Sequence, residues 1–303
     1  MDKLGRKGGL MANKKALYAD IALFIVAIIW GSGFVVTKNA LDYMSPLYIL
    51  GFRFLVAALP MAAISLKRFK NATKTDIKAG LIVGFFMTLG FVFHVIGIQY
   101  TTAGVNGFIA ATNVVMVPFM FWFASKKKPD NFEIFAAILS LIGIGIISID
   151  AKLGIGRGEF ITFLCAISFA MQIVAVGIYA RKVDLYIFTT IQLAVVSLLS
   201  FILAIIFEPP VASISTPAIL SIVYLGIMVT MVGFFVQNIA QSLTSTTHVA
   251  IILSLEAVFG SIISIIFLNE ILTTRFAIGF TAIFISVITS ETKWEFLRRK
   301  SKI

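Results

Sequence analysis

Ten apolar stretches follow one another along this chain, and each is long enough, or nearly so, to cross a bilayer. A membrane-spanning helix needs about 20 predominantly apolar residues. With 59% hydrophobic and 13% charged residues, the composition lies outside the range of soluble domains. The apolar runs are continuous rather than alternating, which favours helices over a β-barrel. We expect the spans at 21–37, 47–66, 79–98, 103–124, 134–149, 160–180, 185–207, 217–236, 249–268 and 272–290. The sequence therefore predicts an all-α integral membrane protein with ten transmembrane helices.

The basic residues lie almost entirely in alternate gaps between these spans. Five segments, namely 3–15, 67–78, 126–128, 181–182 and 293–302, hold 20 of the 25 Lys and Arg residues. By the positive-inside rule, this pattern places both termini in the cytoplasm and predicts a multi-pass protein of the cytoplasmic (inner) membrane. The net charge of +11 is explained by orientation in the membrane, so we expect no nucleic-acid partner.

The chain consists of two weakly similar halves. The tripeptide Leu-Tyr-Ile occurs at 47–49 and again at 185–187. Each half has five spans, an odd number, so the second half must cross the membrane in the opposite sense. In agreement, the gap 208–216 has no Lys or Arg, whereas its partner 67–78 has five. The expected organisation is a cytoplasmic tail at 1–18, a first repeat at 19–150, a second, inverted repeat at 151–290 and a basic cytoplasmic tail at 291–303. Inverted repeats are a recurrent architecture of secondary transporters.

Polar side chains within the spans predict a cavity. Such groups are costly in lipid and normally face a cavity or a partner. At 1.5 Å per residue, six of them fall near the middle of the membrane. We expect these residues to line a substrate-binding cavity: Trp30, Ser32, Asn113, Gln172, Ser254 and Glu256.

Each ionisable candidate has a structural alternative. Glu256 either binds an amine or exchanges a proton, or it locks its span to a neighbour through a hydrogen bond. Arg53 either clamps a carboxylate or serves a structural ion pair, and His94 is either a gate or an interfacial hydrogen-bonding group. Trp30 either stacks over a ligand or packs between helices. The depths of Arg53 and Glu256 differ by roughly 10 Å, so we do not expect them to pair directly.

Several short motifs together resemble the drug/metabolite transporter superfamily, in its ten-helix EamA-like branch. They are Trp-Gly-Ser-Gly-Phe at 30–34, Arg-Phe at 53–54, Gln-Tyr-Thr-Thr-Ala-Gly at 99–104 and Ala-Ile-Ile-Leu-Ser-Leu-Glu at 250–256. The resemblance covers nearly the whole chain, although the family commonly has Pro where this chain has Ala257. It implies a secondary transporter that moves small organic metabolites, often amino acids or amines and commonly outward, by alternating access.

Other functions fit the chain less well. It has no GxxxxGK[ST] phosphate loop, so ATP hydrolysis on this chain is not expected to drive transport. Cys165 is the only cysteine and no metal-binding spacing occurs, so we expect neither cofactor nor metal. A membrane-embedded enzyme stays an alternative, but His94 and His248, the two histidines, lie on different spans. Within transport, a multidrug exporter is the other alternative. The expected partners are a small-molecule substrate and the lipid bilayer, with the protein a monomer or weak homodimer.

Overall fold

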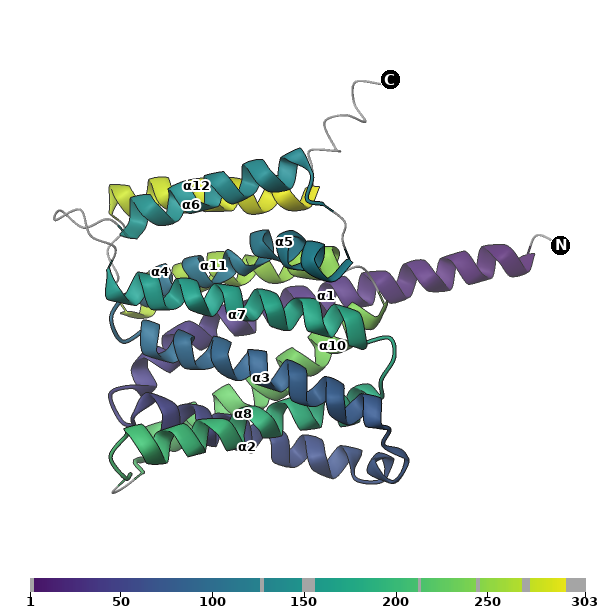
Figure 1. The fold of residues 1–303 in the computed structure, drawn as a ribbon, viewed down its shortest axis with the longest axis horizontal. Coiled ribbons are helices and arrows are strands. Elements are labelled where there is room, and N and C mark those ends of the chain that lie inside the picture. Colours follow the sequence, from purple (N-terminus) through teal and green to yellow (C-terminus); the bar gives the residue numbers. More distant parts are fainter. Residues whose placement is uncertain are drawn as a thin grey trace.

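The computed structural model describes residues 3–125, 128–148, 156–211, 214–243, 246–268 and 273–292, and it is all-helical (Figure 1). The first half consists of α1 (Lys3–Ala40), α2 (Pro46–Ser65), the 3₁₀ turn η1 (Arg68–Asn71), α3 (Lys74–Gly97), α4 (Ala103–Ala111), α5 (Asn113–Ser125) and α6 (Asn131–Ser148). The second half consists of α7 (Arg157–Tyr179), α8 (Leu185–Phe207), α9 (Thr216–Tyr224), the π-helical η2 (Leu225–Val232), α10 (Gly233–Leu243), α11 (Thr246–Leu268) and α12 (Thr274–Thr292).

The helices form ten membrane crossings. The α4–α5 pair makes one crossing, and α9, η2 and α10 together make another. Seven of the crossings are long and apolar enough to span a bilayer, and three apolar helices are shorter: Asn131–Ile146, Ile252–Leu268 and Thr274–Ser286. The protein is therefore a multi-pass membrane protein.

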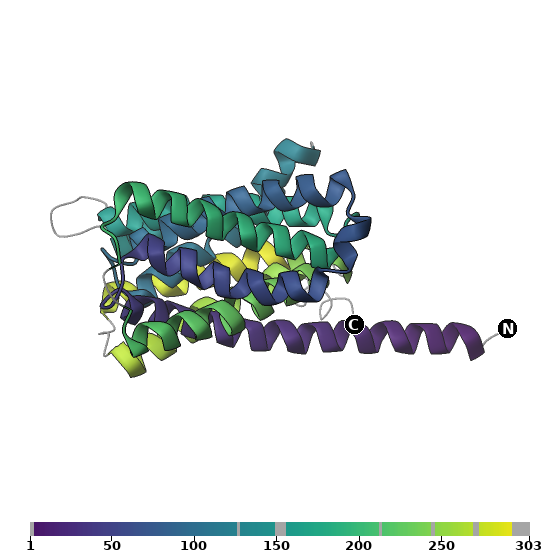
Figure 2. The ribbon, with the colours of Figure 1, turned by 90° about the horizontal axis from the view of Figure 1, so that it is seen from below.

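Two expected boundaries differ from the structure. The eighth crossing continues to Leu243, beyond the expected end at residue 236. The expected N-terminal tail is helical from Lys3 and extends α1 beyond the bundle (Figures 1 and 2). Residues 293–303 of the predicted basic tail, and the gap at 269–272, lie outside the described residues.

The distribution of side chains is that of a protein dissolved in lipid. Large apolar side chains face outward, with Leu59 61% exposed and Ile205 and Phe207 72% exposed. Polar side chains such as Arg53 and Gln192 are buried instead. A soluble protein with this much exposed apolar surface would aggregate, whereas lipid makes the arrangement favourable.

The two halves interlock through matched helix pairs. α2 packs against α8 and α6 against α12, and each of these pairs joins equivalent helices of the two halves (Figure 1). α1 packs against α11, and its equivalent contact, between α7 and the α4–α5 crossing, is also present. We call the end of the bundle at which α1 begins the basic end, because the turns before α3 and before α8 lie there as well. The other end is called the opposite end.

Burial establishes the register between the halves. At a spacing of 139 residues, nine of the ten buried positions of α2 coincide with buried positions of α8. For α3 and the eighth crossing, the matching spacing is 142 residues as far as Thr230 and 143 from Gly233 onward. The π-helical η2 accounts for this change, because a π-bulge accommodates one extra residue in a helix.

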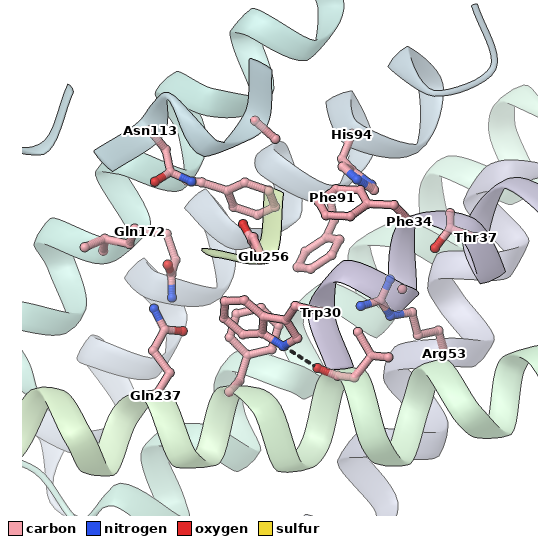
Figure 3. Close-up of a pocket in the computed structure, with 16 residues that line it drawn as sticks. Trp30, Phe34, Thr37, Arg53, Phe91, His94, Asn113, Gln172, Gln237 and Glu256 are labelled. Atoms are coloured by element: carbon pink, nitrogen blue, oxygen red, sulfur yellow. Dashed lines mark hydrogen bonds between the residues drawn. The ribbon is translucent and has the colours of Figure 1, made fainter. Parts of the chain in front are cut away.

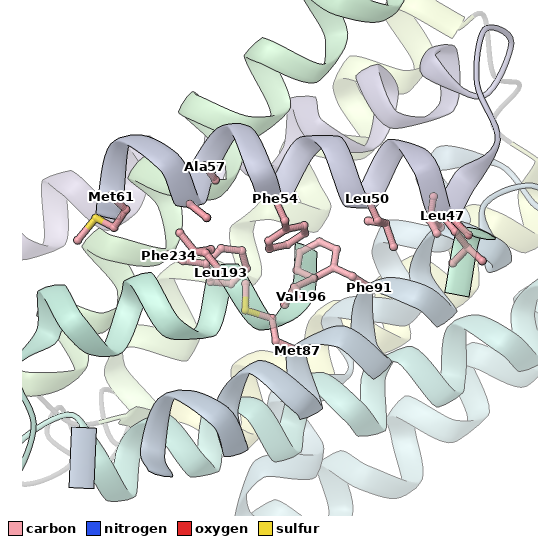
Figure 4. Packing of buried hydrophobic residues seen from close by; sticks show 13 residues of the cluster. Leu47, Leu50, Phe54, Ala57, Met61, Met87, Phe91, Leu193, Val196 and Phe234 are labelled. Carbon is pink, nitrogen blue, oxygen red and sulfur yellow. The ribbon is translucent and has the colours of Figure 1, made fainter. Parts of the chain in front are cut away.

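Small residues allow the closest helix contacts. Gly31 of α1 lies directly against the backbone of α11 at Gly260. Gly80 and Gly84 of α3 lie against Ile191 and Val195 of α8, as expected for a GxxxG pattern. Beside this contact, the largest apolar cluster joins α2, α3, α8 and α10 around Phe54, Met87, Phe91, Leu193 and Phe234 (Figure 4).

Candidate functional site

A cavity of about 80 Å³ lies between the two halves, at the middle of the bundle (Figure 3). Its polar lining consists of Thr37, Arg53, His94, Asn113, Gln172, Gln237 and Glu256. Its aromatic lining consists of Trp30, Phe34, Phe91, Phe169 and Phe234. A second cavity of about 30 Å³ shares Trp30, Asn113, Gln237 and Glu256 with the first, and it adds Gln241 and Ser254. The pair of cavities thus forms one polar region within the membrane.

Several polar atoms of the lining lack a partner within the protein. Among the described residues, no hydrogen bond reaches Thr37 Oγ1, His94 Nδ1, Asn113 Oδ1, Gln172 Nε2 or Gln237 Oε1, all of which are buried. Gln172 and Gln237 point toward one another across the cavity (Figure 3). Buried polar groups in proteins are nearly always paired with protein, water or a ligand. The cavity therefore has the hydrogen-bonding capacity to hold a polar guest.

Trp30 is held in place by the π-helical segment. Its indole Nε1 donates a hydrogen bond of 2.8 Å to the carbonyl oxygen of Val229 in η2. Its ring packs against Phe234 with the centroids 5.0 Å apart. Gly233 makes this position possible, because a Cβ atom there would collide with the indole. The indole nitrogen is thus already bonded, and the ring can act as an apolar wall.

Arg53 is held by the same segment. Its Nε donates a hydrogen bond of 2.6 Å to Thr230 Oγ1, and its guanidinium group lies 4.8 Å from the centroid of the Phe91 ring. The side chain is only 3% exposed, and no carboxylate pairs with it among the described residues. The expectation that Arg53 and Glu256 form no direct pair is therefore confirmed. The terminal nitrogens of Arg53 are left to bind an anionic group.

Glu256 projects into the cavity from α11 (Figure 3). Its side chain is half-buried, and the described residues offer its carboxyl group no hydrogen bond. α11 is fixed there by the contact of its backbone with Gly31, which involves the carbonyl oxygen of Glu256 itself. A carboxyl group in this setting can bind a cationic group or exchange a proton with the cavity.

Asn113 lies at a break in a transmembrane helix. α4 ends at Ala111 and α5 begins at Asn113, with the hydroxyl group of Thr112 donating to the carbonyl oxygen of Ile109 at 2.6 Å. Discontinuous helices are typical of transporter binding sites, where irregular backbone can line a cavity. The equivalent helix α11 is continuous, in keeping with Ala257 rather than Pro.

The structure places most of the predicted site residues together. Trp30, Asn113, Gln172 and Glu256 line the central cavity, as does Arg53. Ser254 lines the second cavity.

Ser32 and His94 lie elsewhere than expected. Ser32 is outside both cavities, because its hydroxyl group bonds to the carbonyl oxygen of Ile29 and to the hydroxyl group of Tyr224. His94 faces the cavity rather than the membrane interface, with its ring between those of Phe34 and Phe91.

Sequence reasoning missed one polar residue and the aromatic walls. Gln237 was overlooked because the expected span ended one residue earlier, although an amide in an apolar run is a usable signal. Phe91 and Phe234 carry no such signal among 29 phenylalanines.

The lining itself is pseudo-symmetric. At the spacings established by burial, four pairs of equivalent positions face the cavity from both halves: Trp30 and Phe169, Phe91 and Phe234, His94 and Gln237, Asn113 and Glu256. Gly90 accommodates the Phe169 ring in the same way that Gly233 accommodates Trp30. The site is therefore built by both repeats together.

Ten crossings in two interlocked halves, with a polar cavity between them, define a membrane transporter with inverted repeats. A family model described as the EamA-like transporter family matches residues 17–149 and 156–291. The chain belongs to the EamA-like transporter family. It is 34% identical to an uncharacterised transporter of Archaeoglobus fulgidus, over 93% of this chain and 88% of the relative.

Two more distant proteins are also similar. A probable amino-acid metabolite efflux pump of Salmonella typhimurium is 23% identical over 89% of this chain and 90% of its own length. A solved crystal structure matches with a TM-score of 0.66 at 16% identity, over 90% of this chain and 97% of the other. This last match supports the fold.

Proposed function

We propose that the protein is a secondary transporter that moves small organic metabolites across the cytoplasmic membrane by alternating access. The substrate class that fits the site best is an amino acid or a related amine, and the proposed direction is export. The observation that carries the proposal is the enclosed cavity between two inverted halves, with a cation and a carboxyl group in one lining. Arg53 would bind the carboxylate of the substrate through its terminal nitrogens, and Glu256 would bind its ammonium group.

The unpaired amides complete the proposed binding site. Asn113, Gln172 and Gln237 each have a free hydrogen-bonding atom toward the cavity or beside it. Their bonds to a polar substrate would offset the loss of its hydration. Trp30 would contribute an apolar wall and, toward an ammonium group, a cation–π contact.

The proposal is tested by transport in proteoliposomes loaded with radiolabelled amino acids, amines or nucleosides, with counterflow measured at two pH values. We expect counterflow of at least one amino acid or amine in the wild type. Glu256→Gln is expected to abolish transport or to uncouple it from pH, with normal membrane assembly. Ser32→Ala is the matched control, because Ser32 lies outside both cavities. Wild-type counterflow in Glu256→Gln across the whole panel would assign Glu256 to helix packing instead.

The proposed orientation puts the basic end, and both termini, in the cytoplasm. It is supported by the clustering of Lys and Arg in the gaps at that end. Single cysteines can test it in a Cys165→Ser background. Asn71→Cys, exposed on η1 at the basic end, should react with an impermeant thiol reagent only from the cytoplasm, and Ser215→Cys only from outside. The reverse pattern would contradict the orientation.

One observation favours a second candidate, a multidrug exporter. Five aromatic rings line the cavity, and such walls suit bulky apolar amines. A transporter of this kind would carry apolar cations and would not depend on Arg53. Arg53→Gln therefore separates the two candidates, since it should abolish amino-acid transport and leave the transport of apolar amines intact.

A further inference from the structure

The cavity is less symmetric than the fold that surrounds it. At the spacing of 139 residues, Arg53 corresponds to Gln192 and Thr37 corresponds to Val176. Arg53 and Thr37 line the cavity, whereas Gln192 and Val176 are 0% exposed and lie outside it. The first half therefore presents to the cavity two positions that the second half keeps buried.

Gln192 is an anomalous residue in its present position. It lies on α8, and neither its Nε2 nor its Oε1 has a hydrogen-bond partner among the described residues. An amide buried without partners costs about 1–3 kcal/mol, and in lipid no bulk water is available to relieve it. Such a residue is better explained by a partner in another conformation than by packing in this one.

The partner that symmetry assigns to Gln192 is occupied differently here. Arg53 donates to Thr230, and the equivalent of Thr230 in the first half is Thr88, 142 residues earlier. In this structure the Thr88 hydroxyl group donates to the carbonyl oxygen of Gly84 in its own helix, at 2.8 Å. The Thr88 oxygen can still accept a hydrogen bond. The equivalent of the Arg53–Thr230 bond is thus unformed, which shows that the two halves have different conformations.

In transporters built from inverted repeats, the two halves move against one another around a shared site, so each half can adopt the conformation of the other. We infer that Gln192 joins the cavity wall in the state open toward the basic end, where its Nε2 donates to Thr88 Oγ1. In that state Arg53 withdraws to the environment that Gln192 has here. The inference rests on the proposed alternating-access transport. It means that a substrate meets a cation in one state and a neutral amide in the other.

The first test replaces the amide by an apolar side chain of similar size. Gln192→Leu removes an unpaired buried group from the present state and a hydrogen bond from the other state. It should raise the Tm of the purified protein and lower transport turnover between about twofold and tenfold, the effect of one net hydrogen bond. The affinity measured in the present state should not change. A lower Tm with normal turnover would show a merely structural role and overturn the inference.

Ser200→Ala is the matched control. Ser200 lies on the same helix and also has a buried hydroxyl group without a partner. Its equivalent in the first half is Met61, which belongs to the apolar core rather than to the cavity. Ser200→Ala should leave turnover unchanged. An equal loss of turnover in both variants would overturn the inference.

The second test follows accessibility in a Cys165→Ser background that retains transport. Under turnover conditions, Gln192→Cys and Val176→Cys should react with a hydrophilic maleimide applied at the basic end. Thr37→Cys should react from the opposite end. If Thr37→Cys is labelled and transport proceeds while Gln192→Cys and Val176→Cys stay unlabelled, the inference is wrong. Failure of the parent variant to transport any substrate would instead count against the proposed function.

Discussion

The contact between α1 and α11 allows one substitution to be worked through in detail. A Cβ atom on Gly31 would lie 2.7 Å from the backbone nitrogen of Gly260, 2.8 Å from Phe259 Cβ and 2.9 Å from the carbonyl oxygen of Glu256. Ordinary contacts begin near 3.4 Å. Two of these three atoms belong to the backbone of α11 and cannot rotate away. In Gly31→Ala, α1 and α11 must therefore separate by roughly 0.7 Å where Glu256 enters the cavity.

The cost of this separation can be bounded. Overpacking of an interior typically costs about 1–3 kcal/mol. Each kcal/mol lowers the Tm by roughly 2–4 °C for a chain of 150–250 residues, and by somewhat less for a longer chain. We therefore expect Gly31→Ala to lower the Tm by about 2–10 °C in a thermal-unfolding assay of the detergent-solubilised protein.

The control for this prediction lies two residues further along the same helix. A Cβ atom on Gly33 would meet only side-chain methyl groups of Val229, the nearest at 3.0 Å, and these can shift by a few tenths of an ångström. Both substitutions gain the same helix propensity of Ala over Gly, so their difference isolates the contact with α11. A Tm of Gly31→Ala equal to or above that of Gly33→Ala would refute the reasoning.

Two further predictions concern other parts of the molecule. The Glu208 carboxylate accepts hydrogen bonds from two backbone N–H groups at the start of α2, but burial outweighs them and raises the pKa of Glu208 above its ordinary value. The native state then binds this proton more tightly than the unfolded state, so the wild type should gain Tm relative to Glu208→Gln as the pH falls toward 4.5. An unchanged difference between the two proteins across that range would contradict this linkage. Gly233→Ala should displace Trp30 from the Val229 carbonyl group, weaken substrate binding and shift tryptophan fluorescence, whereas Gly107→Ala, with contacts no closer than 3.3 Å, should do neither.

Much of the site could be predicted from the sequence because lipid penalises polar groups locally. Asn113, Gln172 and Glu256 stand out as polar residues in apolar runs, and their depth follows from their distance to the span ends. Depth alone does not give direction around the helix axis. Ser32 has the right depth but points toward Tyr224 rather than into the cavity.

The role of η2 could not have been predicted in this way. Its one extra residue changes the spacing between the halves from 142 to 143, and this places Gln237 rather than Val236 opposite His94 as its equivalent. The amino acids of η2 are ordinary apolar ones, so their composition does not distinguish a π-helix from an α-helix. The hydrogen bonds from Trp30 and Arg53 to η2 join residues 199 and 177 positions apart in the chain.

The sequence by itself determined the ten crossings, their helical form and the opposed sense of the two halves. These follow from the free energy of transferring about 20 residues into lipid and from the positions of charges, both of which are local properties of the chain. Only the tertiary structure decided which side chains share the cavity and which, like Gln192, are kept out of it. Rotation about each helix axis depends on packing between helices far apart in sequence, including contacts as close as that of Gly31 with Gly260.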